Sequence, residues 1–150
     1  MELEIVKITA FQFGELVFAC EQSSDDISCY FDKQTGDIEM LGDYIESDPE
    51  LEERIEEEFG ERYIRVPKIE SWQSFEDMEE FVTTVQDERM QKSLERALSG
   101  GKGVFGRFKD TLSDDDDLLN AWYAFKDQRN KERVIELLEE EENIKLIVDA

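Results

Sequence analysis

The residues best suited to binding chemistry lie together in one short segment, residues 100–110. It holds four of the chain's eight glycines, three basic residues and two phenylalanines. Glycine lets the backbone approach a ligand closely, cations attract an anion, and aromatic rings offer a stacking surface. The Gly-rich basic loop 100–109 therefore predicts a site for an anionic ligand. The residues predicted to contact that ligand are Arg96, Gly101, Lys102, Gly103, Arg107, Lys109 and Trp122.

The same segment also fits a purely structural role. Gly100 is a suitable helix end, and the glycines after it would connect that helix to the next one. Lys102 is followed by glycine instead of Ser or Thr, so the segment is not a Walker phosphate loop. Four nearby aromatic residues occur in pairs spaced i, i+3, which suits core packing as well as stacking on a base. They are Phe105, Phe108, Trp122 and Phe125.

The positive charge of the chain is concentrated in residues 89–109. This stretch has six basic residues and one acid, a local charge of +5, whereas the whole chain carries −23 and the remainder therefore −28. Arg89, Lys92 and Arg96 share one helical face by their i, i+3, i+7 spacing. They would either pair with surrounding acids or form an anion-binding face. A chain this acidic disfavours direct binding to nucleic acid and to anionic membranes, and favours a basic partner protein.

The absence of histidine limits the chemistry that is available. It removes Ser-His-Asp and Cys-His catalysis, imidazole metal ligation and the usual general base near neutral pH. The run Asp114–Asp117 lacks the alternating spacing of a calcium loop and fits the start of a helix better. We assign no catalytic residue, no metal ligand and no cofactor. Whether the protein is an enzyme stays open, but the sequence favours a protein without catalytic activity.

The cellular setting is expected to be cytoplasmic. No apolar run approaches the roughly 18 residues of a membrane span, and the first residues lack the basic region of a signal peptide. Cys20 and Cys29 do not form a Cys-x-x-Cys pair. We expect two reduced thiols, at least one of them in the core.

The sequence of the N-terminal part, about residues 1–68, indicates a small sheet with two helices. Strands 27–31 and 38–41 form a hairpin closed by Gly36, and a third strand covers 62–66. An extended segment precedes Thr9, which would cap a helix. The apolar residues of that helix also partly alternate like those of a strand. A second helix has the cap Asp48 followed by proline, and ends near Phe59.

The part from about residue 69 to 142 predicts four helices. Their proposed starts are Ser74, in a capping box with Asp77, then Asp87, then Val104, and Ser113, which precedes the Asp run. The second helix ends at Gly100 and the last near Glu142, and residues 144–148 would form a final strand. We expect a single α+β domain over residues 1–150, with the antiparallel sheet packed against the C-terminal helical group.

Several segments together resemble one protein family. They are residues 30–37, 62–67, 78–82, 87–89, 94–98, 101–110 and 122–125. The most specific is Gly-x-Phe-x-x-Phe-Lys-Asp, residues 103–110, followed by Trp-x-x-Phe. This pattern is similar to that of the uncharacterised bacterial protein family 158, over most of the chain. The resemblance implies an α+β fold and a bacterial cytosolic setting, and no reaction.

Three functions follow from these observations. The leading one is a binding or regulatory protein without enzymatic activity, whose partner is a basic protein or a small anionic ligand. The first alternative is a phosphate- or nucleotide-binding protein that uses the basic loop. The second is a nucleic-acid mimic that blocks a basic protein through its charge. The sequence does not indicate an oligomeric state.

Overall fold

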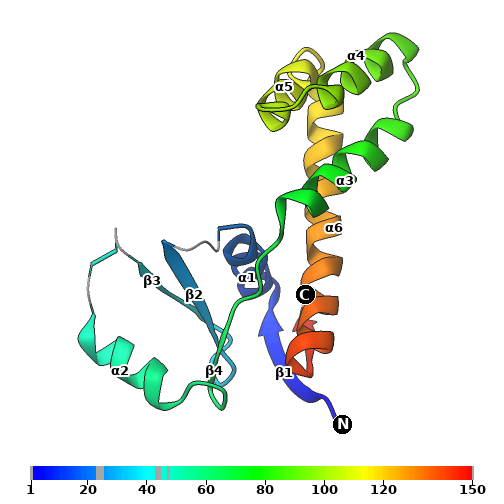
Figure 1. Ribbon diagram of the computed structural model, residues 1–150. Helices are drawn as coiled ribbons and strands as arrows, with labels where there is room; N and C mark the ends of the chain where they lie inside the picture. Colours follow the sequence, from blue (N-terminus) through cyan, green and yellow to red (C-terminus); the bar gives the residue numbers. More distant parts are fainter. Residues whose placement is uncertain (1, 23–25, 43–44, 47, 150) are drawn as a thin grey trace. The chain divides into compact units, whose positions relative to one another are not determined.

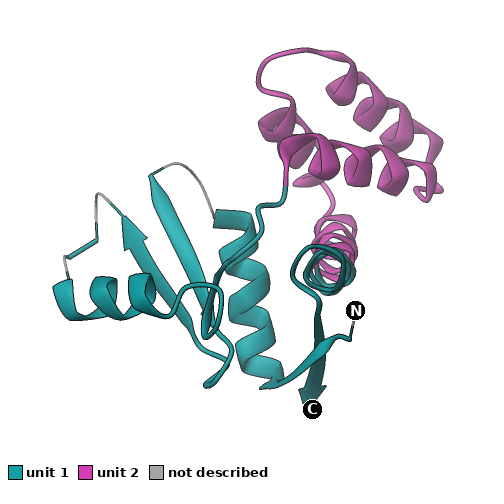
Figure 2. Cartoon of the chain, turned by 60° about the horizontal axis from the view of Figure 1, so that its bottom comes forward, with its two compact units in different colours: residues 1–69, 131–150 teal, residues 70–130 magenta. Residues whose placement is uncertain are grey.

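The fold is α+β and is described by a computed structural model, for residues 2–22, 26–42, 45–46 and 48–149. The chain divides into two compact units (Figure 2). Residues 1–69 and 131–150 make the first, here called the sheet unit, and residues 70–130 make the second, the helical unit. Each unit has its own hydrophobic core, so each is described by itself.

The sheet unit contains two small sheets (Figure 1). The hairpin β2 (Ile27–Asp32) and β3 (Ile38–Gly42) is joined by β4 (Tyr63–Arg65) in an antiparallel sheet of order β3-β2-β4, which confirms the predicted hairpin and third strand. β1 (Glu4–Thr9) and β5 (Ile144–Asp149) form a separate parallel pair, with Val6 opposite Leu146. Both were expected to be extended, but their pairing was not predicted.

Two helices of the sheet unit begin at the residues that the sequence indicates. Before α1 (Ala10–Gln22), the Thr9 hydroxyl accepts a hydrogen bond from the Gln12 backbone N–H at 3.1 Å, and the Gln12 side chain accepts one from the Thr9 N–H at 3.0 Å. This reciprocal capping box favours the helix over the strand alternative. α2 (Pro49–Glu57) is capped by Asp48, whose carboxylate accepts from the Leu51 N–H at 3.2 Å.

The helical unit holds α3 (Ser71–Thr83), α4 (Glu88–Ser99), α5 (Val104–Leu112) and the first part of α6 (Asp116–Glu142). Asp87 caps α4 as predicted, accepting from the N–H groups of Arg89 and Met90. The last turns of α6 belong to the sheet unit.

Two of the predicted helix starts are wrong. α3 begins three residues before Ser74, where the Gln73 side chain accepts a hydrogen bond from the Glu70 N–H at 2.9 Å. Ser113 instead follows the last turn of α5, and its N–H donates to the Lys109 carbonyl. The cap of α6 is Asp115, which accepts from the Leu118 N–H at 3.2 Å. In both cases a competing capping residue nearby forms the better-placed bond.

The core of the sheet unit lies around α1. Apolar side chains from α1, both sheets and the end of α6 form one buried cluster, which includes Phe13, Leu16, Phe31, Val134, Leu138 and Ile144. Cys20 and Cys29 are both buried and free, as expected of reduced thiols. Burial raises the pKa of the Cys20 thiol, so its reactive thiolate form is disfavoured.

The hairpin turn is attached to the start of α1. The Gln12 side-chain nitrogen donates to the Thr35 carbonyl at 2.8 Å and to the Asp37 carboxylate at 3.0 Å. Gly36, between them, has φ +81°, a left-handed conformation that residues with a Cβ rarely adopt. A Cβ at this position would lie 2.8 Å from the Gln12 side-chain oxygen and 2.9 Å from an Ile8 methyl carbon.

The change Gly36→Ala is expected to lower the free energy of unfolding by about 2 kcal/mol, from the left-handed backbone and the crowding together. The matched control is Gly14→Ala, because Gly14 lies inside α1 and a Cβ added there would have no other atom within 4 Å. That change should raise the free energy of unfolding by about 0.5–1 kcal/mol. Urea unfolding followed by circular dichroism measures both. An unchanged or raised free energy of unfolding in Gly36→Ala would contradict the tight fit at Gly36.

Candidate functional site

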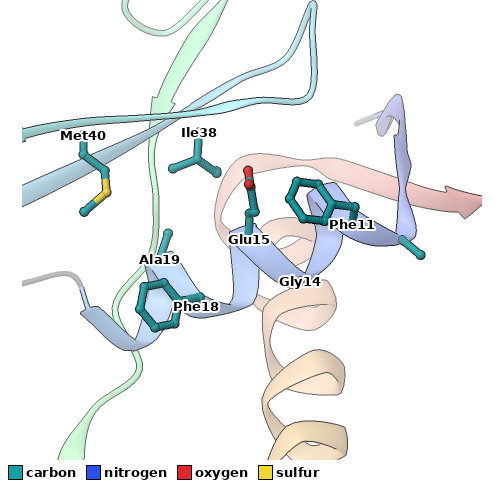
Figure 3. A pocket seen from close by; sticks show the side chains of 8 residues that line it. Phe11, Gly14, Glu15, Phe18, Ala19, Ile38 and Met40 are labelled. Carbon is teal, nitrogen blue, oxygen red and sulfur yellow. The ribbon is translucent and has the colours of Figure 1, made fainter.

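An apolar groove lies between α1 and β3 in the sheet unit (Figure 3). We call it the α1–β3 groove. Its volume is about 510 Å³, and it is open to solvent. Its lining residues are Ala10, Phe11, Gly14, Glu15, Phe18, Ala19, Ile38 and Met40. Apart from Glu15, all of them are apolar or glycine.

The groove follows from the way α1 covers the sheet. α1 buries Phe13, Leu16 and Val17, whereas Phe11 and Phe18, at i and i+7, are 75% and 58% exposed. Residues opposite each other in an antiparallel pair point to the same face, so Met40 shares its face with its partner Cys29. Cys29 is fully buried, but Met40, on the edge strand, is 37% exposed. The helix thus leaves the edge of the sheet uncovered.

The sheet unit is strongly acidic. It contains 26 of the chain's 40 acidic residues and nine of its 17 basic residues, a formal net charge of −17. The helical unit accounts for the remaining −6. An exposed apolar groove in so acidic a unit can attract a cationic partner over a distance and bind it through apolar contact.

Arg107, a predicted ligand-binding residue, is bonded to the loop itself. Its guanidinium donates to the carbonyl oxygens of Lys102 at 2.6 Å, Gly101 at 3.4 Å and Ala97 at 3.4 Å. A Cβ at Gly100 would overlap this guanidinium, which explains the glycine there. The Arg107 side chain therefore satisfies carbonyls at the end of α4 and in the turn that follows. Its contact with a ligand stays a prediction.

The other predicted residues fall in two groups. Arg96, Gly101, Lys102 and Gly103 are exposed near the end of α4 and the start of α5. Lys109 and Trp122 line a different feature, a smaller cavity within the helical unit. The structure thus separates the predicted set into a loop group and a cavity group.

The aromatic residues near the loop differ in their environment. Trp122 is 7% exposed, and its ring lies 5.1 Å from Phe108 and 5.3 Å from Phe81, measured between centroids. Phe108 is 1% exposed, whereas Phe105 is 46% exposed. Phe108 and Trp122 are therefore core residues, which leaves little of either ring face open for stacking on a base.

The smaller cavity, which we call the lysine cavity, encloses about 190 Å³. Its lining residues are Ser74, Met78, Phe105, Phe108, Lys109, Trp122, Tyr123 and Lys126. Each of the three contributing helices presents residues at i and i+4, so each turns one face toward it. Sequence reasoning missed Ser74, Tyr123 and Lys126 as site residues. Lys126 follows Trp122 by four residues, and this spacing could have placed the two side chains on the same helix face.

Two kinds of feature are absent from the described residues. No helix within them is long and apolar enough to cross a membrane. They also contain no cluster of three or more Cys, Asp or Glu side chains arranged to hold a metal ion.

Comparison with known proteins identifies the family. Residues 9–149 match the model of the uncharacterised protein family UPF0158. The chain belongs to this family. The match confirms the resemblance carried by the glycine- and aromatic-containing segments. It also covers every residue that lines the α1–β3 groove and the lysine cavity of this UPF0158 member.

One curated relative is the UPF0158 protein PA5073 of Pseudomonas aeruginosa. It is 29% identical over 126 residues, which cover 84% of this chain and 79% of the relative. No solved structure is significantly similar to the chain. The family description and the relative's name state no activity, so a function for this UPF0158 member has to be argued from its own surfaces and cavities.

Proposed function

We propose that this protein is a binding protein whose α1–β3 groove holds a basic amphipathic helix of a partner protein. The observation that carries the proposal is the pair Phe11 and Phe18, more than half exposed beside a groove, in a unit of net charge −17. Contiguous exposed apolar surface of this kind marks interaction sites in soluble proteins.

The dimensions of the groove fit a helix. Phe11 and Phe18 are seven residues apart on α1, which is about 10 Å along the helix axis at 1.5 Å per residue. That distance matches the apolar residues at i, i+3 or i+4, and i+7 by which amphipathic helices bind in grooves. Gly14, at the centre of the lining, presents no side chain and allows close approach.

Charge favours a basic partner over a second copy of this chain. Self-association through the groove would bring together two units of −17 each, and like charges across an interface oppose binding. A partner with Lys and Arg beside its apolar face would instead be drawn toward Glu15 and the surrounding acidic surface. A nucleic-acid mimic would also bind a basic protein, but through charge alone.

A labelled synthetic peptide tests the proposal. A helix of about 18 residues with leucine on one face and lysine on the other spans five turns. We expect micromolar binding by fluorescence anisotropy, and about tenfold weaker binding to Phe18→Ser, since burying an aromatic side chain contributes roughly 1.5–3 kcal/mol and 1.4 kcal/mol is a factor of ten. The matched control Trp72→Ser removes a 61% exposed aromatic residue of the helical unit and should bind like the unaltered protein.

Salt separates apolar from purely electrostatic binding. Raising the salt from about 0.1 M to about 1 M shortens the screening length from about 10 Å to about 3 Å. The ratio between the unaltered protein and Phe18→Ser should persist at high salt. Equal binding by the two proteins, with complete loss at high salt, would favour the mimic. A concentration-dependent dimer that Phe18→Ser dissociates would favour self-association, and either result would overturn the proposal.

A further inference from the structure

The lysine cavity combines an aromatic wall with two cationic side chains, and we propose that it binds a small aromatic carboxylate. This site lies within the helical unit and is independent of the α1–β3 groove. Neither the family description nor the relative's name assigns a ligand to it.

The aromatic wall has an inner and an outer part. Phe108 and Trp122 form the inner part and are 1% and 7% exposed. Phe105 and Tyr123 are 46% and 42% exposed and form the outer part. A flat ring that enters the cavity would pack mainly against Phe105 and Tyr123, because little of either inner ring face is open.

The volume selects a ligand with a single ring. The cavity encloses about 190 Å³. An apolar cavity of about 150 Å³ holds a benzene molecule. About 40 Å³ would therefore remain beside a single ring. This is roughly the volume that one water molecule occupies in the liquid, and is close to the size of a carboxylate. A nucleotide, with a base, a sugar and a phosphate, would extend well beyond this space.

The two lysines select an anion. Lys109 on α5 and Lys126 on α6 both line the cavity, and the Lys109 ammonium lies 5.8 Å from the centroid of the Tyr123 ring. Within the described part of the chain, no ion pair joins either lysine to a carboxylate. Both ammonium groups can therefore donate charge-assisted hydrogen bonds to a ligand carboxylate, and the Ser74 hydroxyl can donate a third.

The local charge supports access by anions. The six basic residues within 89–109 belong to the same unit, in which α4 and α5 are in contact. They offset part of the acidic charge of this unit, whose formal net charge is −6, and so weaken the repulsion of a small anion there. The basic residues of this stretch would thus favour the approach of a small anion, without any phosphate bound at its glycines.

Trp122 provides a direct probe of occupancy. In the variant Trp72→Phe it is the one remaining tryptophan, because the chain has two. Three probes are titrated: benzoate, which has the ring and the charge, acetate, which has the charge alone, and benzyl alcohol, which has the ring alone. We expect benzoate to change the Trp122 emission at a concentration at least tenfold lower than either other probe. Acetate or benzyl alcohol acting at the same concentration as benzoate would overturn the proposal.

Matched lysine variants locate the anion. Lys109→Met and Lys126→Met keep an unbranched side chain that is one atom shorter and remove its charge. Each should weaken benzoate binding about tenfold, the loss of one charge-assisted hydrogen bond. Lys92→Met, an equal change of charge on exposed α4, should leave binding unchanged. If Lys102→Met in the glycine loop weakens binding as much as Lys109→Met, the anion binds at the loop and the proposal is wrong. Urea unfolding of each variant verifies that the helical unit is intact.

Discussion

Replacement of Phe108 by alanine is expected to lower the free energy of unfolding of the helical unit by about 4 kcal/mol. Its ring is 1% exposed and belongs to the buried cluster of that unit, with Leu94, Leu112 and Phe81 among its members. It also meets Trp122 edge-on, at 5.1 Å between centroids and an interplanar angle of 74°. The alanine variant would lose the free energy that the protein gains by burying the whole ring. It would also contain a cavity that the neighbouring helices fill only partly.

Phe105→Ala is the matched control, because it removes the same ring three positions earlier on α5. Phe105 is 46% exposed, so its loss should cost less than about 1 kcal/mol. Urea unfolding in the Trp72→Phe variant, followed by Trp122 emission, reports on this unit directly. A loss at Phe108 as small as the one expected at Phe105 would mean that Phe108 is not a core residue, and would favour an exposed aromatic stacking surface.

The second large effect is expected at Asp32, whose replacement by alanine should lower the free energy of unfolding by about 3 kcal/mol. The Asp32 carboxylate is buried at the end of β2. It accepts hydrogen bonds from Nε and Nη2 of the Arg62 guanidinium, at 3.1 Å and 2.9 Å. It also accepts from the N–H groups of Gln34 and Thr35 in the hairpin turn. Its removal would leave the two turn N–H groups without their partner, and would leave Arg62 only the more distant carboxylate of Glu58, at 3.6 Å.

The pH dependence of this effect has a definite sign. Burial by itself would raise the pKa of Asp32, but hydrogen bonds from Arg62, Gln34 and Thr35 outweigh it and hold the pKa below its ordinary value. A lowered pKa in the folded state stabilises the protein above the unfolded value, near about pH 3.9, and the contribution is lost as the pH falls through the folded value.

Comparison with Asp32→Asn isolates this contribution from the titration of the other acids. The difference in free energy of unfolding between the unaltered protein and Asp32→Asn should be constant from about pH 7 to about pH 5 and should shrink below about pH 4. Urea unfolding at a series of pH values measures it. A difference that grows as the pH falls would contradict the hydrogen-bonded, ionised carboxylate.

Local signals in the sequence determined many of the elements. The hairpin depends on Gly36, the start of α2 on Asp48 followed by proline, and the start of α4 on Asp87, and each of these residues acts on backbone groups within a few positions. The same reasoning failed at Ser74 and Ser113. There, two neighbouring residues compete for one set of N–H groups, and the choice depends on how the chain enters the helix.

The candidate sites depended on which faces of the helices and strands pack against each other. Phe11 and Phe18 lie on α1 together with its buried residues, and whether their side chains are buried too depends on how far the helix extends over β3. The β1–β5 pair joins the two ends of the chain, for which no local signal exists. Loop composition likewise suggested Arg107 as an anion contact, which stays a prediction, but it gave no sign that the guanidinium donates to backbone carbonyls of its own loop.

The sequence by itself determined the family, the α+β class and the contrast between a basic stretch and an acidic chain, because composition, short motifs and capping patterns are local properties. Tertiary structure alone decided that Lys109 and Trp122 line one cavity with Lys126, and that Arg96 and Lys102 are not part of this lining. A cavity is formed by side chains of separate helices, and the packing of those helices depends on contacts between residues distant in the chain.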